Sequence, residues 1–218
     1  MNNNDRYAVV GHPVAHSRSP FIHARFAEQT HQALEYGTLD VKPERFEAEV
    51  RHFFATGGKG LNVTVPHKEA AFQLAAELTP RAQAARAVNT LAIGKSGALL
   101  GDNTDGAGLA RDLLNNQRVA IAGRRLLLLG AGGAARGVLA PLLGLRPSSL
   151  TVVNRTVQRA DELVASFTGF GAIRARSYAE LGDESFDIVI NATAASLAGA
   201  IERAGRAFRD AASVDGLG

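Results

Sequence analysis

Cysteine is absent from this sequence of 218 residues. Its absence excludes disulfide bonds and thiolate metal sites and fits a reducing compartment, so we expect a cytoplasmic location. The six histidines show no His-Glu-x-x-His spacing and no paired ligands, so we expect no metal site. Residues 1–5 lack the basic and apolar regions of a signal peptide, and no apolar run reaches the about 20 residues that cross a bilayer. We therefore expect no membrane association.

The chain carries a formal net charge of +3 and has a sequence pI near 9.6, which at first suggests an acidic partner. The arginines are dispersed, however, without a long basic run or interleaved aromatic residues, so we expect no nucleic-acid partner. A few arginines placed for the phosphates of a small anionic cofactor explain the charge equally well. The oligomeric state stays open between a monomer and a homodimer.

Short apolar runs alternate with longer amphipathic ones along the chain. This pattern is typical of βαβ units and predicts an α/β fold with mostly parallel sheets. Strands are expected at residues 7–10, 34–39, 61–65, 89–93, 98–100, 126–129, 150–153 and 186–190. Helices are expected at residues 20–29, 43–54, 107–116, 134–143, 158–167 and 201–209. Because the pattern starts again at Arg125, we expect two α/β domains, residues 1–106 and residues 107–218.

A glycine-rich turn follows the apolar strand at residues 126–129 and opens a helix. Its sequence matches the G-x-G-x-x-G/A pattern of dinucleotide-binding Rossmann domains, and it comprises Gly130, Ala131, Gly132, Gly133, Ala134 and Ala135. Gly130 permits the tight turn, Gly132 lets the backbone approach a pyrophosphate, and Ala135 allows close packing of helix on sheet. The helix N-terminus offers N–H donors to the phosphates. A glycine turn without a ligand is the alternative.

The end of the next strand distinguishes between the two nicotinamide cofactors. An acidic residue there binds the ribose hydroxyls of NAD, whereas an arginine accommodates the 2′-phosphate of NADP. Here the strand ends in Asn154, Arg155 and Thr156, with Arg159 one helical turn further on. Two guanidinium groups and a hydroxyl suit a phosphate dianion, so NADP is predicted. Alternatively, Asn154 forms a turn and Thr156 caps the helix while Arg155 stays solvated.

Three polar segments lie at or beyond strand ends in the N-terminal half. They are residues 11–20, residues 62–68 and residues 101–106. The carboxyl ends of strands form the edge at which open α/β sheets bind ligands. The sequence therefore predicts a second binding site in this half.

Taken together with the glycine turn and the Asn-Arg-Thr segment, these motifs closely resemble the shikimate dehydrogenase family from about Tyr7 to Thr193. The resemblance implies an N-terminal substrate domain and a C-terminal Rossmann-type domain with a cleft between them. It also implies the reversible reduction of 3-dehydroshikimate to shikimate by NADPH, in the pathway to chorismate and the aromatic amino acids. The expected partner is then a small-molecule substrate.

The resemblance also implies roles for individual residues. Ser17 and Ser19 would hold the substrate carboxylate, and Asn62, Thr64 and Asn89 would contact ring hydroxyls. Lys68 and Asp105 would flank the reacting carbon as the catalytic pair. The cofactor would contact Gly130, Gly132, Gly133, Ala134, Ala135, Asn154, Arg155, Thr156, Arg159 and Thr193.

Elementary chemistry supports several of these roles. Strand alternation places Asn62 and Thr64 on one face, opposite Leu61, Val63 and Val65. Hydride transfer to a carbonyl carbon leaves negative charge on the oxygen, which a nearby ammonium can stabilise and protonate. Lys68 can serve in that way.

Helix capping is the alternative role for two of the polar residues. Ser19 lies before Pro20, and Asp105 lies before Gly106, so each is placed to cap the helix that follows. His67 is interpreted as structural, because related motifs also carry an apolar residue at that position.

The C-terminal part departs from the family pattern. Family members continue after residues 191–193 through a strand with a tyrosine near the substrate and later a helix with a substrate-contacting glutamine, and neither is found here. The tail of the second domain is therefore expected to be incomplete relative to the family. Two other functions remain open: a quinate/shikimate dehydrogenase that uses NAD, and a catalytically dead, ligand-sensing homologue.

Overall fold

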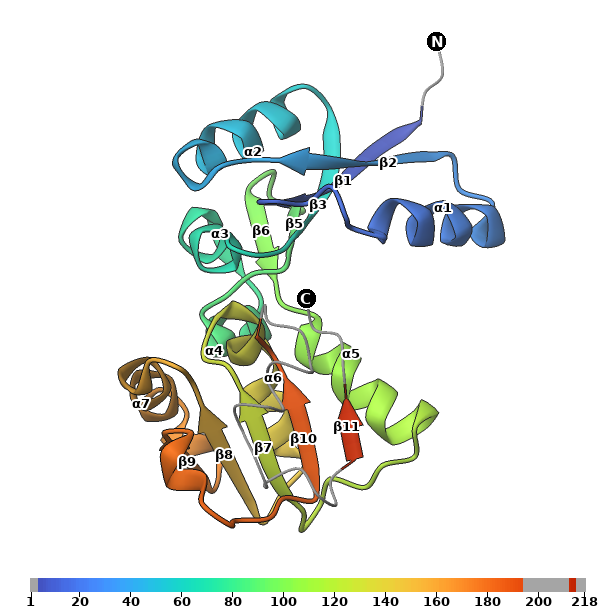
Figure 1. The fold of residues 1–218 in the computed structure, drawn as a ribbon. Coiled ribbons are helices and arrows are strands. Elements are labelled where there is room, and N and C mark those ends of the chain that lie inside the picture. Colours follow the sequence, from blue (N-terminus) through green and yellow to red (C-terminus); the bar gives the residue numbers. More distant parts are fainter. Residues whose placement is uncertain (1–3, 194–211, 215–218) are drawn as a thin grey trace. The chain divides into compact units, whose positions relative to one another are not determined.

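A computed structural model describes residues 4–193 and 212–214 of the chain (Figure 1). The chain divides into two compact units, residues 1–103 and residues 104–218. The expected boundary, between residues 106 and 107, lies slightly further along the chain.

The first unit contains a mixed six-stranded sheet in the order β2-β1-β3-β5-β6-β4. Its strands are β1 (Asp5–Gly11), β2 (Leu34–Asp40), β3 (Gly58–Val63), β4 (Glu77–Leu78), β5 (Thr90–Ile93) and β6 (Leu99–Asp102). Its helices are α1 (Ser19–Thr30), α2 (Phe46–Ala55), α3 (Lys68–Leu74) and α4 (Pro80–Ala85), with a 3-10 turn at Pro43–Arg45 before α2. β1 pairs in parallel with β2 and β3, whereas β5 pairs antiparallel with β3 and β6. The expected hairpin is present, with Gly97 at a φ of 85° in its turn.

The core of this unit lies between the sheet and α2. Helix α2 presents Phe46, Val50 and Phe53 to the sheet, and all three are buried, because a spacing of three or four residues keeps them on one helical face. The approach at β3 is so close that a Cβ on Gly58 would lie 2.1 Å from the Phe53 ring. The strand expected at residues 61–65 ends early, at Val63. Val65 was expected on the same strand face as Leu61 and Val63, which are buried, but it lies beyond the strand and is 46% exposed.

The second unit contains a five-stranded sheet in which all the described pairings are parallel, in the order β11-β10-β7-β8-β9. Its strands are β7 (Arg125–Leu129), β8 (Ser149–Val153), β9 (Ile173–Arg176), β10 (Ile188–Asn191) and β11 (Ala212–Val214). Its helices are α5 (Asp105–Arg111), which continues as a π-helical turn at Asp112–Asn116, α6 (Gly133–Gly144) and α7 (Val157–Ala165). Short 3-10 turns lie at Thr168–Phe170 and Ala179–Leu181. The helix expected at residues 201–209 lies outside the described residues.

Strand β7 is buried on both faces, as its unbroken run of leucines predicted. Leu126 and Leu128 belong to one hydrophobic cluster, with α6, and Leu127 and Leu129 belong to another, on the opposite face. All four side chains are fully buried. Among the described residues, no helix has the length and apolarity needed to span a bilayer.

Candidate functional site

The first polar segment forms a loop between β1 and α1. Ser17 donates a hydrogen bond from its Oγ to the Oγ of Ser19 over 3.1 Å, and the Ser19 N–H donates to the Ser17 Oγ over 3.3 Å. At the start of the loop, the Asp40 carboxylate accepts the Val14 N–H and lies 2.6 Å from His12 Nδ1, which lowers the pKa of Asp40. The two serines are thus held next to each other.

The capping alternative for Ser19 does not fit this geometry. The N-cap position of α1 falls on Arg18, and Ser19 is already the first helical residue. Pro20 follows it in the first turn, where its missing N–H costs no helical hydrogen bond. The Ser19 hydroxyl therefore does not serve as the N-cap of this helix.

Tyr36 joins the serine loop to Asn62, a contact that no sequence motif predicted. Its hydroxyl donates a hydrogen bond of 2.6 Å to Asn62 Oδ1 and is also hydrogen-bonded to Ser19. The His23 ring stacks on the Tyr36 ring, with centroids 4.0 Å apart and planes 5° apart. Burial raises the pKa of Tyr36 to about 12, so the phenol keeps its proton and acts as a donor at neutral pH.

Lys68 lies at the start of α3, beyond the end of β3. Lys68 is only 6% exposed, although Val65 and Pro66 before it are exposed. The neighbouring His67 is 1% exposed, stacks on Phe46, and has its Nε2 2.7 Å from the Val41 carbonyl oxygen. Burial lowers the pKa of His67. These contacts agree with the structural role expected for His67, and they anchor the residue next to Lys68.

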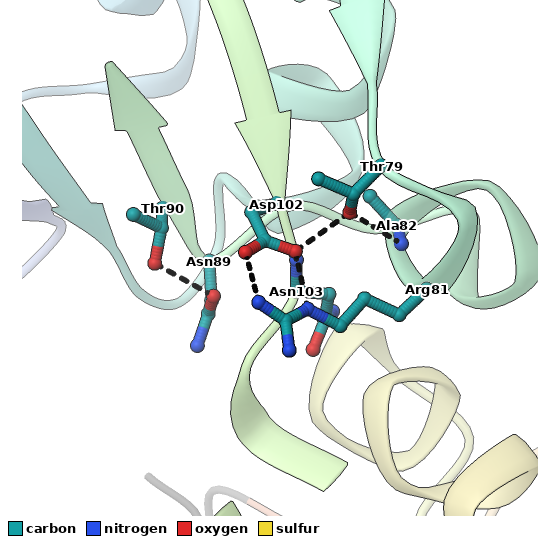
Figure 2. Close-up of polar contacts among 7 residues, drawn as sticks. All are labelled: Thr79, Arg81, Ala82, Asn89, Thr90, Asp102 and Asn103. Atoms are coloured by element: carbon teal, nitrogen blue, oxygen red, sulfur yellow. Dashed lines mark hydrogen bonds and ion pairs between the residues drawn. The ribbon is translucent and has the colours of Figure 1, made fainter. Parts of the chain in front are cut away.

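Asn89 lies just before β5, with its side chain beside that of Thr90 (Figure 2). Its backbone connects it to neighbouring segments. Its N–H donates to the Asp102 carbonyl over 2.9 Å, and its carbonyl accepts the Val63 N–H over 2.7 Å. Its side-chain Oδ1 accepts the Thr90 hydroxyl over 2.9 Å. One residue earlier, the Val88 N–H donates to the Lys68 carbonyl over 2.8 Å. The backbone of Asn89 and that of Lys68 are therefore linked through a single residue.

Six of the predicted residues lie in the first unit: Ser17, Ser19, Asn62, Thr64, Lys68 and Asn89. Hydrogen bonds connect Ser17, Ser19 and Asn62 through Tyr36. Thr64 lies just past β3, where its N–H donates to the Val10 carbonyl over 2.9 Å. Asp105 belongs to the second unit, as the first residue of α5, and the N-cap position of that helix falls on Thr104.

The glycine turn of the second unit has the predicted strand–turn–helix form. Gly130 has a φ of 108°, and a Cβ there would lie 2.8 Å from the Ala192 carbonyl oxygen, so only glycine fits. Gly132 is the N-cap residue of α6, and nothing lies within 4 Å of the place where its Cβ would be. Gly133 and Ala134 follow at the start of the helix, and Ala135 is fully buried against the core.

The segment after β8 leaves its cationic side chains in solvent. Arg155 and Arg159 are exposed, and so is Thr156, the N-cap residue of α7, whose side chain makes no capping hydrogen bond. Asn154 Nδ2 donates to the Thr156 carbonyl over 2.9 Å, which is the turn expected as an alternative role for Asn154. Two arginines are thus accessible to an anion at this strand end.

Thr193 follows β10 and lies next to the glycine turn. Its N–H and hydroxyl both donate to Asn191 Oδ1, over 3.1 and 2.7 Å. Its methyl group would be 3.2 Å from a Cβ on Gly130. Within residues 4–193 and 212–214, no group of three or more His, Asp or Glu side chains is placed to hold a metal ion.

A parallel sheet with this turn after β7 and arginines after β8 defines a Rossmann-type dinucleotide-binding protein. Residues 9–91 match the family described as the shikimate dehydrogenase substrate binding domain, and residues 109–205 match the one described as shikimate / quinate 5-dehydrogenase. The chain belongs to the shikimate dehydrogenase family.

Individual relatives agree with this assignment. The chain is 58% identical over 195 residues to a shikimate dehydrogenase (NADP(+)) of Aeromonas hydrophila, a match that covers 89% of this chain and 71% of the relative. The crystal structure of an Ael1 enzyme from Pseudomonas putida matches with a TM-score of 0.79 and 46% identity, over 89% of this chain and 71% of that one. Shikimate 5-dehydrogenase from Thermus thermophilus, in complex with NADP(H) and shikimate, matches with a TM-score of 0.75 and 35% identity, over 87% and 68%.

Proposed function

We propose that this chain is an NADP-dependent oxidoreductase that reversibly reduces 3-dehydroshikimate to shikimate, a step toward chorismate and the aromatic amino acids. The observation that carries the proposal is that the chain pairs an intact dinucleotide turn with a hydrogen-bonded set of hydroxyl and amide groups. The curated relatives with 52–58% identity bear the name shikimate dehydrogenase (NADP(+)). We also propose a cytoplasmic location.

The polar groups of the first unit suit a hydroxylated ring acid. Ser17 and Ser19 offer two adjacent hydroxyls for the substrate carboxylate. Tyr36 donates to Asn62 Oδ1, so the Asn62 amide nitrogen is the end that remains to donate to a ring hydroxyl. Thr64 and Asn89 supply further polar groups at the ends of neighbouring strands. This set favours a small polyhydroxylated carboxylate over an apolar substrate.

The groups of the second unit suit NADP. The N-terminus of α6 and the open space at Gly132 allow a pyrophosphate to approach the backbone. Arg155 and Arg159 would hold the 2′-phosphate by charge-assisted hydrogen bonds, with Asn154 and Thr156 beside them. When bound, NADPH supplies the hydride.

Lys68 is proposed as the group that stabilises and protonates the oxygen on which negative charge develops. Because Lys68 is largely buried, that interaction is stronger than in water, since the lower dielectric of the protein interior screens charge less. Asp105 is proposed as the second catalytic residue, which helps to take the alcohol proton in the oxidative direction.

The test is a spectrophotometric assay of the purified chain with shikimate and NADP, and then with quinate and NAD. We expect NADP reduction with shikimate, and slower or no turnover with quinate and NAD. Faster turnover with quinate and NAD would replace the proposal by a quinate dehydrogenase. Binding of shikimate and NADP by calorimetry without any turnover would instead indicate a ligand sensor.

A further inference from the structure

We propose that Arg81 and Asp102 are positioning residues for Asn89, and through it for the substrate; this rests on the proposed function. Neither residue was singled out by the sequence motifs. They lie 21 positions apart, on α4 and at the end of β6, and their side chains meet as an ion pair (Figure 2).

The Asp102 carboxylate is held by four donors. Its Oδ1 accepts the Thr79 hydroxyl at 2.6 Å, Arg81 Nε at 2.6 Å and the Asn103 N–H at 2.7 Å, and its Oδ2 pairs with Arg81 Nη2. Thr79 is itself fixed, because its Oγ1 also accepts the Ala82 N–H as the N-cap of α4. The guanidinium hydrogen bond lowers the pKa of Asp102, so the carboxylate is ionised at neutral pH.

This network reaches Asn89 through the backbone of Asp102. The Asp102 carbonyl accepts the Asn89 N–H, and the Asn103 side chain donates to the Ala87 carbonyl over 3.0 Å. The three residues 87–89 are therefore bound at both ends to the segment that the carboxylate holds. A shift of Asp102 would carry the backbone of Asn89 with it.

The arrangement differs from an ordinary surface ion pair. Exposed pairs usually contribute little to stability, because solvent screens the charges and two long side chains lose freedom. Here Arg81 is half exposed, with 50% of its side chain accessible, but the carboxylate it holds is only 18% accessible and also accepts hydrogen bonds from Thr79, at the N-cap of α4, and from the Asn103 N–H. Loss of the Arg81–Asp102 ion pair is therefore expected to change the geometry around Asn89 as well as the stability of the protein.

The structure offers a matched control on α2. Arg51 contacts Glu47 Oε1 through Nε and Nη2, at 2.9 and 2.8 Å, the same two guanidinium nitrogens that Arg81 uses toward Asp102. Both side chains are 65% exposed, and neither belongs to the site. Arg51→Ala removes an exposed arginine–carboxylate ion pair without touching Asn89.

The experiment is a double-mutant cycle with Arg81→Ala, Asn89→Ala and the combined variant, measured by steady-state kinetics. Asn89 is proposed to contact the substrate before and during reaction, so its displacement raises KM more than it lowers kcat. We expect Arg81→Ala to raise the KM for shikimate about tenfold, the factor that corresponds to 1.4 kcal/mol. The KM for NADP and the kinetics of Arg51→Ala should stay unchanged.

Coupling is the decisive result. If Arg81 acts through Asn89, the double variant should have nearly the KM of Asn89→Ala alone, whereas independent effects would multiply. Asp102→Asn should resemble Arg81→Ala, and Arg81→Lys should lie between it and the wild type, since it keeps the charge but loses the paired hydrogen bonds. If Arg81→Ala does not fold, the same comparison can be made with Asp102→Asn and Arg81→Lys, by kinetics and by shikimate titration.

Two outcomes would overturn the inference. One is a lower melting temperature for Arg81→Ala with an unchanged KM for shikimate, which would leave the pair a purely structural role. The other is multiplicative effects in the double variant. Failure of the proposed function is separate, because it would show in the unmodified chain as the absence of shikimate turnover and binding.

Discussion

At the scale of single residues, Arg155 and Lys68 differ in exposure, and their substitutions are expected to affect different steps. Arg155 is exposed at the end of β8 and has room to bind an anion. Lys68 is largely buried and is the first residue of α3. The first should govern the affinity for the cofactor, and the second should govern the rate of the chemical step.

Replacing Arg155 by Asp should weaken NADP binding by about tenfold or more, since the loss of a charge-assisted hydrogen bond costs about 1.5–3 kcal/mol. Binding of NAD should change much less, because NAD has no 2′-phosphate. Calorimetric titration of both cofactors measures this. The matched control is Arg124→Asp, an exposed charge reversal just before β7, at the other end of its strand from the glycine turn. Equal NADP affinity in Arg155→Asp and the wild type would contradict the 2′-phosphate assignment.

Replacing Lys68 by Ala should lower kcat by about 10²–10⁴, the usual contribution of a positioned acid or base. Its effect on the KM for shikimate should be smaller, because the ammonium acts mainly on charge that develops in the transition state. Steady-state kinetics on a variant with a near-native circular dichroism spectrum measures the split. A kcat within about threefold of the wild type, far below that range, would remove Lys68 from the proposed chemistry.

At the scale of elements, the turn between β7 and α6 distinguishes two roles of glycine. Gly130 needs its positive φ and has no space for a Cβ, whereas Gly132 has a φ of −94° and open space around it. The first glycine is required by the fold of the turn. The second is required only by a ligand that approaches the backbone.

Gly130→Ala should therefore destabilise the protein by about 1–3 kcal/mol, the usual cost of a strained backbone conformation. Gly132→Ala should leave stability nearly unchanged but weaken NADP binding, since its methyl group would occupy the space proposed for the pyrophosphate. Urea denaturation and NADP titration of both variants separate the two effects. If Gly132→Ala binds NADP as tightly as the wild type, the pyrophosphate does not lie at this turn.

His67, the residue before α3, should make the stability of the protein depend on pH. Burial lowers the pKa of His67 in the folded protein below its ordinary value of 6.5. Above pH 6.5 the imidazole is neutral in both states; as the pH falls through 6.5, the unfolded chain gains a proton that the folded protein resists. The free energy of unfolding should therefore decrease below pH 6.5.

His67→Phe should reduce that decrease, because phenylalanine can retain the packing on Phe46 but cannot take up a proton. Urea unfolding between pH 7.5 and 5.5 measures it. His23 provides an internal comparison, since burial lowers its pKa as well and it remains in the variant. An identical pH dependence in wild type and variant would show that His67 does not contribute.

At the scale of the whole molecule, local sequence patterns predicted the long elements and most strands but missed the short helices α3 and α4 and the strands β4 and β9. The leucines of β7 and the glycines after it defined their strand and turn, because burial on both faces and a positive φ each restrict the residue types. Strand β9 was missed because two of its four residues are arginines, and Arg174 is accommodated by a hydrogen bond to Thr151. β4 has only two residues and gives no period to detect.

The same limit applies to the candidate site. Most motif residues were predicted because their segments lie at or beyond strand ends, the edge at which open α/β sheets bind ligands. Tyr36 was missed because its partners, Ser19 and Asn62, lie 17 and 26 positions away in the chain, and only the paired strands bring them together. The alternation holds for Leu61, Asn62 and Val63 but does not extend to Val65, where the strand had already ended.

The β5–β6 hairpin has a consequence for how the substrate end of the first unit moves. Its turn lies at residues 94–98, and Asn89 and Asp102 meet at the opposite, open end. A hairpin opens most easily far from its turn, so the amide proton of Asn89 would exchange with solvent sooner than those near the turn if the strands alone held it. The hydrogen bonds that Thr79 and Arg81 donate to the Asp102 carboxylate hold this open end in addition to the strand pairing. Hydrogen exchange at Asn89 thus reports local unzipping at the place where a ring hydroxyl would bind.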